Sequence, residues 1–169
     1  MRLPAIYISH GGGPWPFVDI PFIPPGELDD LEAYLRTLVT SLPAAPRAIL
    51  MVSAHWEAPV PTLMTNPHPP MLYDYYGFAP EAYRLQWPAP TAGFLVGRVR
   101  ELIQGAGFPV AEDPERGFDH GTFVPLMVAL PDADVPILQL SLLRSMDAAQ
   151  HIALGRALAP LRDEGVLLL

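Results

Sequence analysis

The sequence predicts an α/β protein with a central, mainly parallel sheet flanked by helices, and three observations favour this fold class. Apolar runs of strand length occur at residues 3–10, 48–56, 135–142 and 166–169. Segments with the three- and four-residue apolar spacing of amphipathic helices lie between these runs. Strand, helix and strand in this order imply a right-handed crossover and a parallel pair of strands. At 169 residues, the chain is long enough for one domain with a core, so we expect a single domain over residues 1–169.

Proline and glycine separate the elements of the N-terminal half. Residues 11–25 hold three glycines and five prolines, which predicts a long, stiffened loop. Leucines recurring between positions 28 and 42 then predict a helix that ends before Pro43. The central strand follows at Ala48. Residues 57–90 are rich in proline and aromatic side chains, so we expect mostly loop there, with an edge strand at residues 60–65.

The C-terminal half alternates helix and strand more regularly. Apolar residues between positions 95 and 103 predict a helix that stops at Gly105, followed by a short strand near residues 108–111. A polar turn at 117–122 opens into an apolar helix at 123–130, with Pro125 near its start. After the buried strand at 135–142, a helix is expected to begin at Asp147 and to kink at Pro160.

Composition excludes several classes of function. The chain has 18 acidic and 10 basic residues and a pI near 4.9, which argues against binding of nucleic acid or other polyanions. No apolar run approaches the ~20 residues of a membrane helix, and the N-terminus lacks a signal peptide, so we expect a cytoplasmic protein. There is no cysteine, so any metal must be held by histidine or carboxylate, which favours iron, manganese or an open zinc site.

Two histidines stand at equivalent places. His10 and His55 each follow a serine at or near the end of an apolar strand, and parallel strands bring their carboxyl ends to one rim of a sheet. Because imidazole is the commonest metal ligand, both are candidate ligands. Glu57 lies two residues beyond His55, on the same strand face, and is either a third ligand or a partner of a ligating histidine. His68 and His151 are expected to have surface or packing roles.

His120 lies between Asp119 and Gly121 at the start of a predicted helix. A neighbouring carboxylate can orient an imidazole for proton transfer, although Asp119 also suits a helix cap. The run at residues 73–78, which contains Asp74 and Tyr76, is either a loop covering the core or the wall of a pocket for a planar ring.

Taken in order, the motifs at residues 9–14, 53–56 and 118–122 resemble the class III extradiol ring-cleavage dioxygenases of the LigB superfamily, nearest to the DOPA 4,5-dioxygenase-like branch. Residues 73–78 and 135–141 are similar to that branch too. The resemblance implies an α/β domain that binds Fe(II), or Zn(II) in the purified protein, and cleaves a small aromatic diol with O2. It implies metal ligation by His10 and His55 and acid/base catalysis by His120. Substrate-binding or supporting roles are expected for Asp119, Asp74, Tyr76 and Glu57.

The sequence departs from this family after its last strand. In the family, the strand matching residues 166–169 leads into a Ser/Gly-rich turn whose histidine is a further ligand, and no such residues follow Leu169 here. We therefore expect that the C-terminal part of the family domain is missing, and that an unpaired sheet edge promotes homo-oligomers. The departure keeps other functions open, namely a non-enzymatic, Memo-like binding protein, an inactive metal-binding fragment or a zinc hydrolase.

Overall fold

The computed structural model describes all 169 residues and has a five-stranded sheet at its centre, in the order β4-β2-β6-β1-β7. Three of its four pairings are parallel, and only β2 and β6 run antiparallel. The α/β fold class with a mainly parallel sheet is thus confirmed. The strands of the sheet are β1 (Ala48–Ala58), β2 (Thr62–Met64), β4 (Ala111–Asp113), β6 (Ile137–Leu143) and β7 (Val166–Leu168). A separate parallel pair is formed by β3 (Met71–Leu72) and β5 (Phe118–Asp119).

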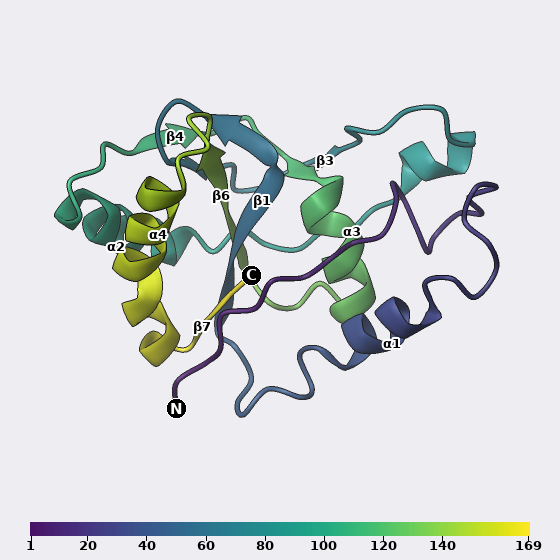
Figure 1. The fold of residues 1–169 in the computed structure, drawn as a ribbon, viewed down its shortest axis with the longest axis horizontal. Helices are drawn as coiled ribbons and strands as arrows, with labels where there is room; N and C mark the ends of the chain where they lie inside the picture. The colour runs from purple at the N-terminus through teal and green to yellow at the C-terminus, as the bar shows by residue number, and fades with distance from the viewer.

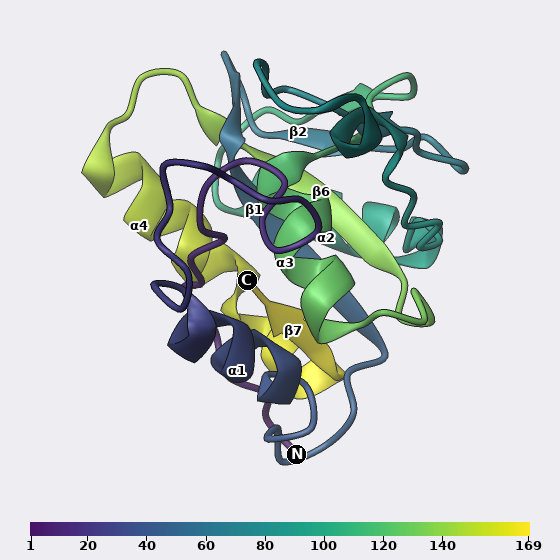
Figure 2. The ribbon, with the colours of Figure 1, turned by 90° about the vertical axis from the view of Figure 1, so that its right-hand side faces the viewer.

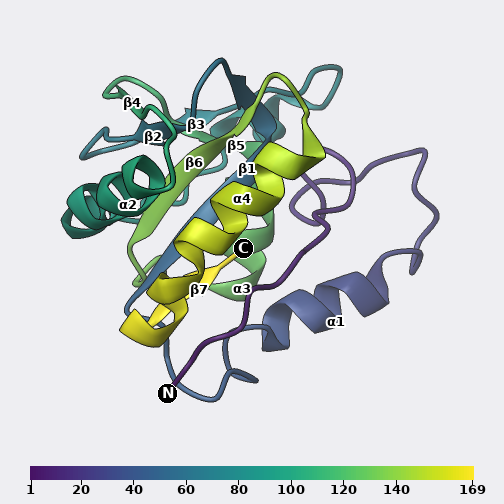
Figure 3. The same ribbon diagram turned by 60° about the vertical axis from the view of Figure 1, so that its left-hand side comes forward.

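Helices cover both faces of the sheet. In Figure 1, α2 (Gly93–Gly105) and α4 (Ala148–Leu158) lie to the left of the strands, and α1 (Asp29–Thr37) and α3 (His120–Ala129) lie to the right. Figure 2 views the sheet from the side of α1 and α3, whereas Figure 3 brings α2 and α4 to the front. Short 3-10 helices occur at Pro80–Arg84 and Ala159–Glu164. None of the helices combines the length and the apolar character needed to cross a bilayer.

Each face of the sheet has its own core, as alternation along β1 requires. Ile49 and Met51 point into a cluster that includes residues of α3, whereas Ala48 and Leu50 point into the cluster formed with α2 and α4. Residues on both faces of β1 are therefore apolar from its start to Met51. This two-sided burial explains the continuous apolar run in the sequence.

The prediction of a strand at residues 3–10 is wrong, because this segment does not form a full strand. Only Ala5 forms a bridge, with Leu168, and the Ile6 N–H donates to the Leu168 carbonyl at 2.9 Å. The expected parallel pairing with the central strand is also wrong, because β7 already occupies that edge of β1. Pairing stays local because β7 is three residues long and Pro4 has no N–H to donate.

The remaining differences concern the bounds of elements. The strand expected at the edge, residues 60–65, is β2, which lies inside the sheet between β4 and β6. The short strand near 108–111 is displaced to Ala111–Asp113, and the helix expected at 123–130 begins earlier, at His120. At Pro160, α4 does not kink but gives way to a 3-10 helix, because proline cannot continue the α-helical hydrogen bonds.

Candidate metal centre

A bulge in β1 carries His55 out of the sheet. The ladder with β6 is regular up to the pair Ser53 and Ser141, and then shifts so that Glu57 pairs with Leu142. Residues 54–56 are therefore unopposed by β6, and the strand can turn its side chains away from the regular alternation. Bulges re-aim side chains in this way beside many active sites. The bulge accounts for the position of His55 at the rim.

A buried carboxylate fixes the start of α3. Asp119 is fully buried, and its Oδ1 caps the helix by accepting from the Thr122 N–H at 3.1 Å. The same side chain accepts from Ser53 Oγ at 2.6 Å, from Arg116 Nη2 at 2.9 Å and from Gln139 Nε2 at 2.8 Å. Buried charge is tolerated when it is paired and fully hydrogen-bonded, as it is here.

Asp119 thereby connects the backbones that carry two of the histidines. His120 is the first residue of α3 and directly follows this carboxylate in sequence. Ser53, which donates to Asp119, also accepts from the His55 N–H at 3.1 Å. The network thus links the rim of β1 with the N-terminal end of α3. We propose that it holds the backbones of His55 and His120 in place.

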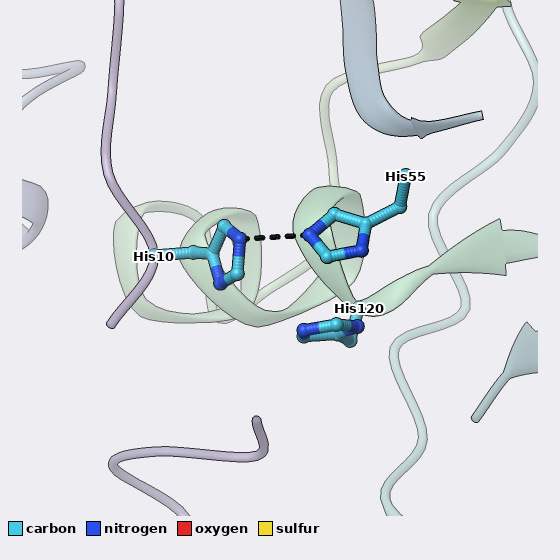
Figure 4. Close-up of side chains that lie close together, drawn as sticks. All are labelled: His10, His55 and His120. Atoms are coloured by element: carbon cyan, nitrogen blue, oxygen red, sulfur yellow. Dashed lines mark hydrogen bonds between the residues drawn. The ribbon is translucent and has the colours of Figure 1, made fainter. Parts of the chain in front are cut away.

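Three imidazoles meet at this rim. His10, from the N-terminal segment, joins His55 and His120, and one nitrogen of each ring lies within 4.8 Å of the others. The Nε2 atoms of His10 and His55 are 3.0 Å apart (Figure 4). The centroids of the His55 and His120 rings are separated by 4.2 Å. The structure therefore brings together the three histidines that the sequence singled out.

Burial keeps His10 in the form that a metal requires. Its pKa is lowered to about 4 by desolvation, with smaller contributions from His120 and His55. At neutral pH the ring is thus uncharged, and a neutral imidazole is the ligating form. Its Nδ1 is buried and has no hydrogen-bond partner.

Asp74 contacts two of the three rings. Its Oδ1 accepts from the backbone N–H of His120 at 2.9 Å and lies 2.7 Å from Nδ1 of that ring. Its Oδ2 is 3.4 Å from Nδ1 of His55. Burial alone would raise the pKa of Asp74, but the hydrogen bonds from His120 outweigh burial and lower it. The carboxylate is therefore ionised at neutral pH.

The other predicted site residues lie further out. Tyr76 is 91% exposed. The Glu57 side chain is exposed and forms neither a hydrogen bond nor an ion pair. In the 73–78 run it is Tyr75, which the sequence did not single out, that contacts the cluster, with its ring 5.5 Å from that of His120. Burial raises the pKa of Tyr75, and its hydroxyl donates to the Ala82 carbonyl.

A small cavity of about 150 Å³ opens beside His10 and His55. Apolar side chains supply most of its lining, including Ile8, Met51 and Leu169. The ligand atoms close enough together to hold one ion come from three imidazoles, with no thiolate, which suits divalent iron or zinc. The residues present thus fit a divalent metal ion.

The surroundings of Gly121 show how closely the site is packed. A methyl group at this position would lie 2.4 Å from Cδ2 and 3.2 Å from Nε2 of the His55 ring. We expect Gly121→Ala to push this ring aside and to weaken zinc binding at least about tenfold, as loss of ligand support does elsewhere. Titration with zinc against a chelating indicator measures this change.

The matched control is Gly97→Ala, in the exposed middle of α2, where nothing lies within 4 Å of the added methyl group. This control should keep zinc affinity and gain about 0.5–1 kcal/mol of stability, since alanine is the better helix former. Equal zinc affinity in the Gly121→Ala variant would show that His55 is free to move and is not held against α3.

Fold and site together define an α/β protein with a histidine cluster suited to a metal at the rim of its sheet. The chain belongs to the LigB family, described as the catalytic LigB subunit of aromatic ring-opening dioxygenase, whose family profile matches residues 5–169. The resemblance seen in the sequence motifs is therefore confirmed.

Individual relatives agree with this assignment. The chain is 44% identical over 166 residues to a 4,5-DOPA dioxygenase extradiol of Beta vulgaris, covering 98% of this chain and 59% of that protein. It is 39% identical to the Escherichia coli protein of the same name, covering 99% and 58%. A crystal structure of an uncharacterized Escherichia coli K12 protein matches with a TM-score of 0.66 and 39% identity, covering 82% of this chain and 50% of that one. The chain spans about half the length of the curated relatives it matches.

Proposed function

We propose that this protein is a non-haem, metal-dependent extradiol dioxygenase that opens the ring of a small, catechol-type diol resembling DOPA with O2. The observation that carries the proposal is the convergence of His10, His55 and His120 in a chain of the LigB family. Fe(II) is the expected metal for activity, and Zn(II) is an expected occupant of the purified protein.

Two of the three histidines are proposed as metal ligands. His10 and His55 present facing Nε2 atoms at the rim and would hold the ion. The bound metal would supply Lewis acidity and a place for the diol and O2 to meet. Burial lowers the pKa of His10, so this ring is uncharged at neutral pH and its charge does not oppose ligation.

His120 is proposed as the acid/base. Its Nδ1 lies 2.7 Å from the Asp74 carboxylate, which leaves Nε2 as the atom that exchanges a proton with a substrate hydroxyl. The carboxylate would stabilise the imidazolium formed when this ring accepts a proton, as in other carboxylate–histidine pairs. Asp74 thus has a supporting role rather than direct contact with the diol.

Aromatic side chains supply the proposed wall for the ring. The buried Tyr75 packs edge-on against both His120 and Phe78, and Phe78 in turn lies against Gly13. Tyr76 is almost fully exposed and adds no contact to this wall. Glu57 has no contact that supports a role at the metal. The single-domain arrangement over residues 1–169 and the formation of homo-oligomers stay predictions.

The proposal is tested by loading the protein with Fe(II) under anaerobic conditions, adding catechol or DOPA and admitting oxygen. A yellow, ring-opened semialdehyde is expected, with none from His55→Ala and a normal yield from His68→Ala. His68 is exposed, and its ring has no partner, so it is a suitable control. No product from the iron-loaded protein, or the same yield from His55→Ala, would contradict the proposal.

A second candidate is a metal-binding, non-enzymatic protein on the same scaffold, as in Memo-like proteins. It is favoured by one observation, namely that the carboxylate nearest the cluster, Asp74, contacts the outer Nδ1 atoms of the rings and not the space between them. Stoichiometric metal without product in the oxygen assay would favour this candidate.

A further inference from the structure

The position of Asp74 is set by strand pairing and does not depend on a metal. In the parallel pair of β3 and β5, Leu72 lies opposite Asp119. Asp74 comes two residues after Leu72, and His120 comes one residue after Asp119. The side chains of Asp74 and His120 therefore meet just beyond the paired strands. The Asp74 N–H also donates to the Leu72 carbonyl at 3.0 Å, which holds the turn. The carboxylate is thus placed before any ion binds.

Hydrogen bonding determines which nitrogen of His120 carries the proton. An ionised carboxylate can only accept, and Asp74 Oδ1 lies 2.7 Å from Nδ1. Nδ1 must therefore bear a hydrogen, so in the neutral ring Nε2 carries the lone pair. The backbone N–H of His120 donates to the same oxygen at 2.9 Å, which fixes the carboxylate as well as the ring.

The other carboxylate oxygen acts on His55. Oδ2 lies 3.4 Å from Nδ1 of that ring, a charge contact that is longer than an ordinary hydrogen bond. A lone pair on Nδ1 would face a negative oxygen across this distance, whereas an N–H there would be attracted to it. The proton on His55 is thus favoured at Nδ1, and Nε2 again faces the shared space.

We propose that Asp74 is a positioning residue that selects the Nδ1–H tautomer of both His55 and His120, so that both Nε2 lone pairs are available at the rim. The inference deepens the proposed function, because ligation by His55 and proton transfer at His120 both require a free Nε2. Carboxylates are known to set the tautomer of metal-ligating histidines, but here one carboxylate serves two rings.

The selection has a consequence for His10. Its Nε2 lies 3.0 Å from Nε2 of His55, and a contact this short needs one proton between the two nitrogens. Because His55 presents a lone pair there, the proton belongs to His10. The Nδ1 of His10 then has a bare lone pair, and this is the buried atom without a partner. His10 is therefore the one ring of the three that must change its tautomer when a metal binds.

Nitrogen-15 NMR of the metal-free, wild-type protein tests the inference directly, because the two ring nitrogens differ in shift according to which carries the proton. Nδ1–H is expected for His55 and His120, and Nε2–H for His10. His151 is an internal reference for Nδ1–H, since its Nε2 accepts from the Leu143 N–H and its Nδ1 lies 2.8 Å from the Asp147 carbonyl. Adding zinc should convert only His10 to Nδ1–H. An Nε2–H signal from His55 or His120 would overturn the proposal.

The Asp74→Asn variant is expected to affect the tautomers of His55 and His120 differently. The single amide oxygen should stay with the two His120 donors, which turns the amide nitrogen toward Nδ1 of His55. We expect His55 to switch to Nε2–H while His120 keeps its tautomer, and zinc affinity to fall about 10- to 100-fold. Asp74→Ala should release both rings. The proposal is overturned if His55 and His120 keep Nδ1–H in both variants.

Glu57→Gln is the matched control, because it removes one negative charge near His55 from a carboxylate with no partner. Its tautomers and zinc affinity should equal those of the wild type. A tenfold loss of affinity in this control would show that general charge, and not the contact with Asp74, determines binding, and would also overturn the proposal. The tautomers and the zinc affinities are all measured without substrate or oxygen. Their outcome therefore does not depend on whether the dioxygenase assay yields a product.

Discussion

Replacing His55 by alanine is expected to weaken zinc or iron binding by about a hundredfold or more. Four-ligand zinc sites bind with roughly 10–16 kcal/mol, or about 3 kcal/mol for each ligand, and 1.4 kcal/mol corresponds to a factor of ten. His55 lies next to both other histidines. Its Nε2 is 3.0 Å from Nε2 of His10, and its ring centroid is 4.2 Å from that of His120. Competition with a chelator of known affinity measures the loss, and His10→Ala should match it.

Two further variants make this result specific. His68→Ala changes an exposed ring outside the cluster and should bind metal as the wild type does. His120→Ala should also retain most of the affinity but yield no ring-opened product, because the proposed role of His120 is proton transfer. If His120→Ala lost as much affinity as His55→Ala, His120 would be a third ligand, which its place in the cluster allows.

The convergence of the histidines could be predicted because it depends on simple geometry. His55 lies near the end of a strand in a mainly parallel sheet, and the strands of such sheets bring residues to a common rim. His10 reaches that rim although its segment is not a full strand. The segment is held by the bridge between Ala5 and Leu168 and by backbone hydrogen bonds from Leu3 and Ile6. Local sequence patterns were sufficient for His55, whereas His10 reaches the rim without the parallel strand pairing on which its prediction depends.

The support around the histidines could not be predicted in the same way. Glu57 was placed beside His55 on the assumption of a regular strand, but the bulge after Ser53 interrupts the two-residue period. The position of Asp74 depends on the register of β3 with β5, and these strands are about 50 residues apart in sequence. Gln139 and Arg116 join Asp119 from other elements and carry no motif of their own. Non-local pairing, unlike periodicity, leaves little trace in a single sequence.

The network around Asp119 leads to the largest expected effect on stability. Asp119→Asn is expected to cost about 3–5 kcal/mol, because removing one partner of a buried ion pair leaves the other without compensation. Here the uncompensated partner would be Arg116, whose guanidinium lies over the Trp56 ring at 4.3 Å and whose Nε already has no hydrogen-bond partner. The amide would also present N–H donors to a shell in which Ser53 and Gln139 donate to the carboxylate. Urea unfolding monitored by fluorescence measures the loss.

Two comparisons show whether the cost arises from the buried charge. Glu101→Ala removes a 70% exposed partner of Arg98 on α2, and surface pairs of this kind contribute only about 0.2–1 kcal/mol. In contrast, combining Asp119→Asn with Arg116→Met removes both charges and should recover part of the loss, because an apolar side chain tolerates the same buried position. If Asp119→Asn cost no more than Glu101→Ala, the network would not be what joins the rim of β1 to α3, and the position of His120 would have to depend on Asp74 alone.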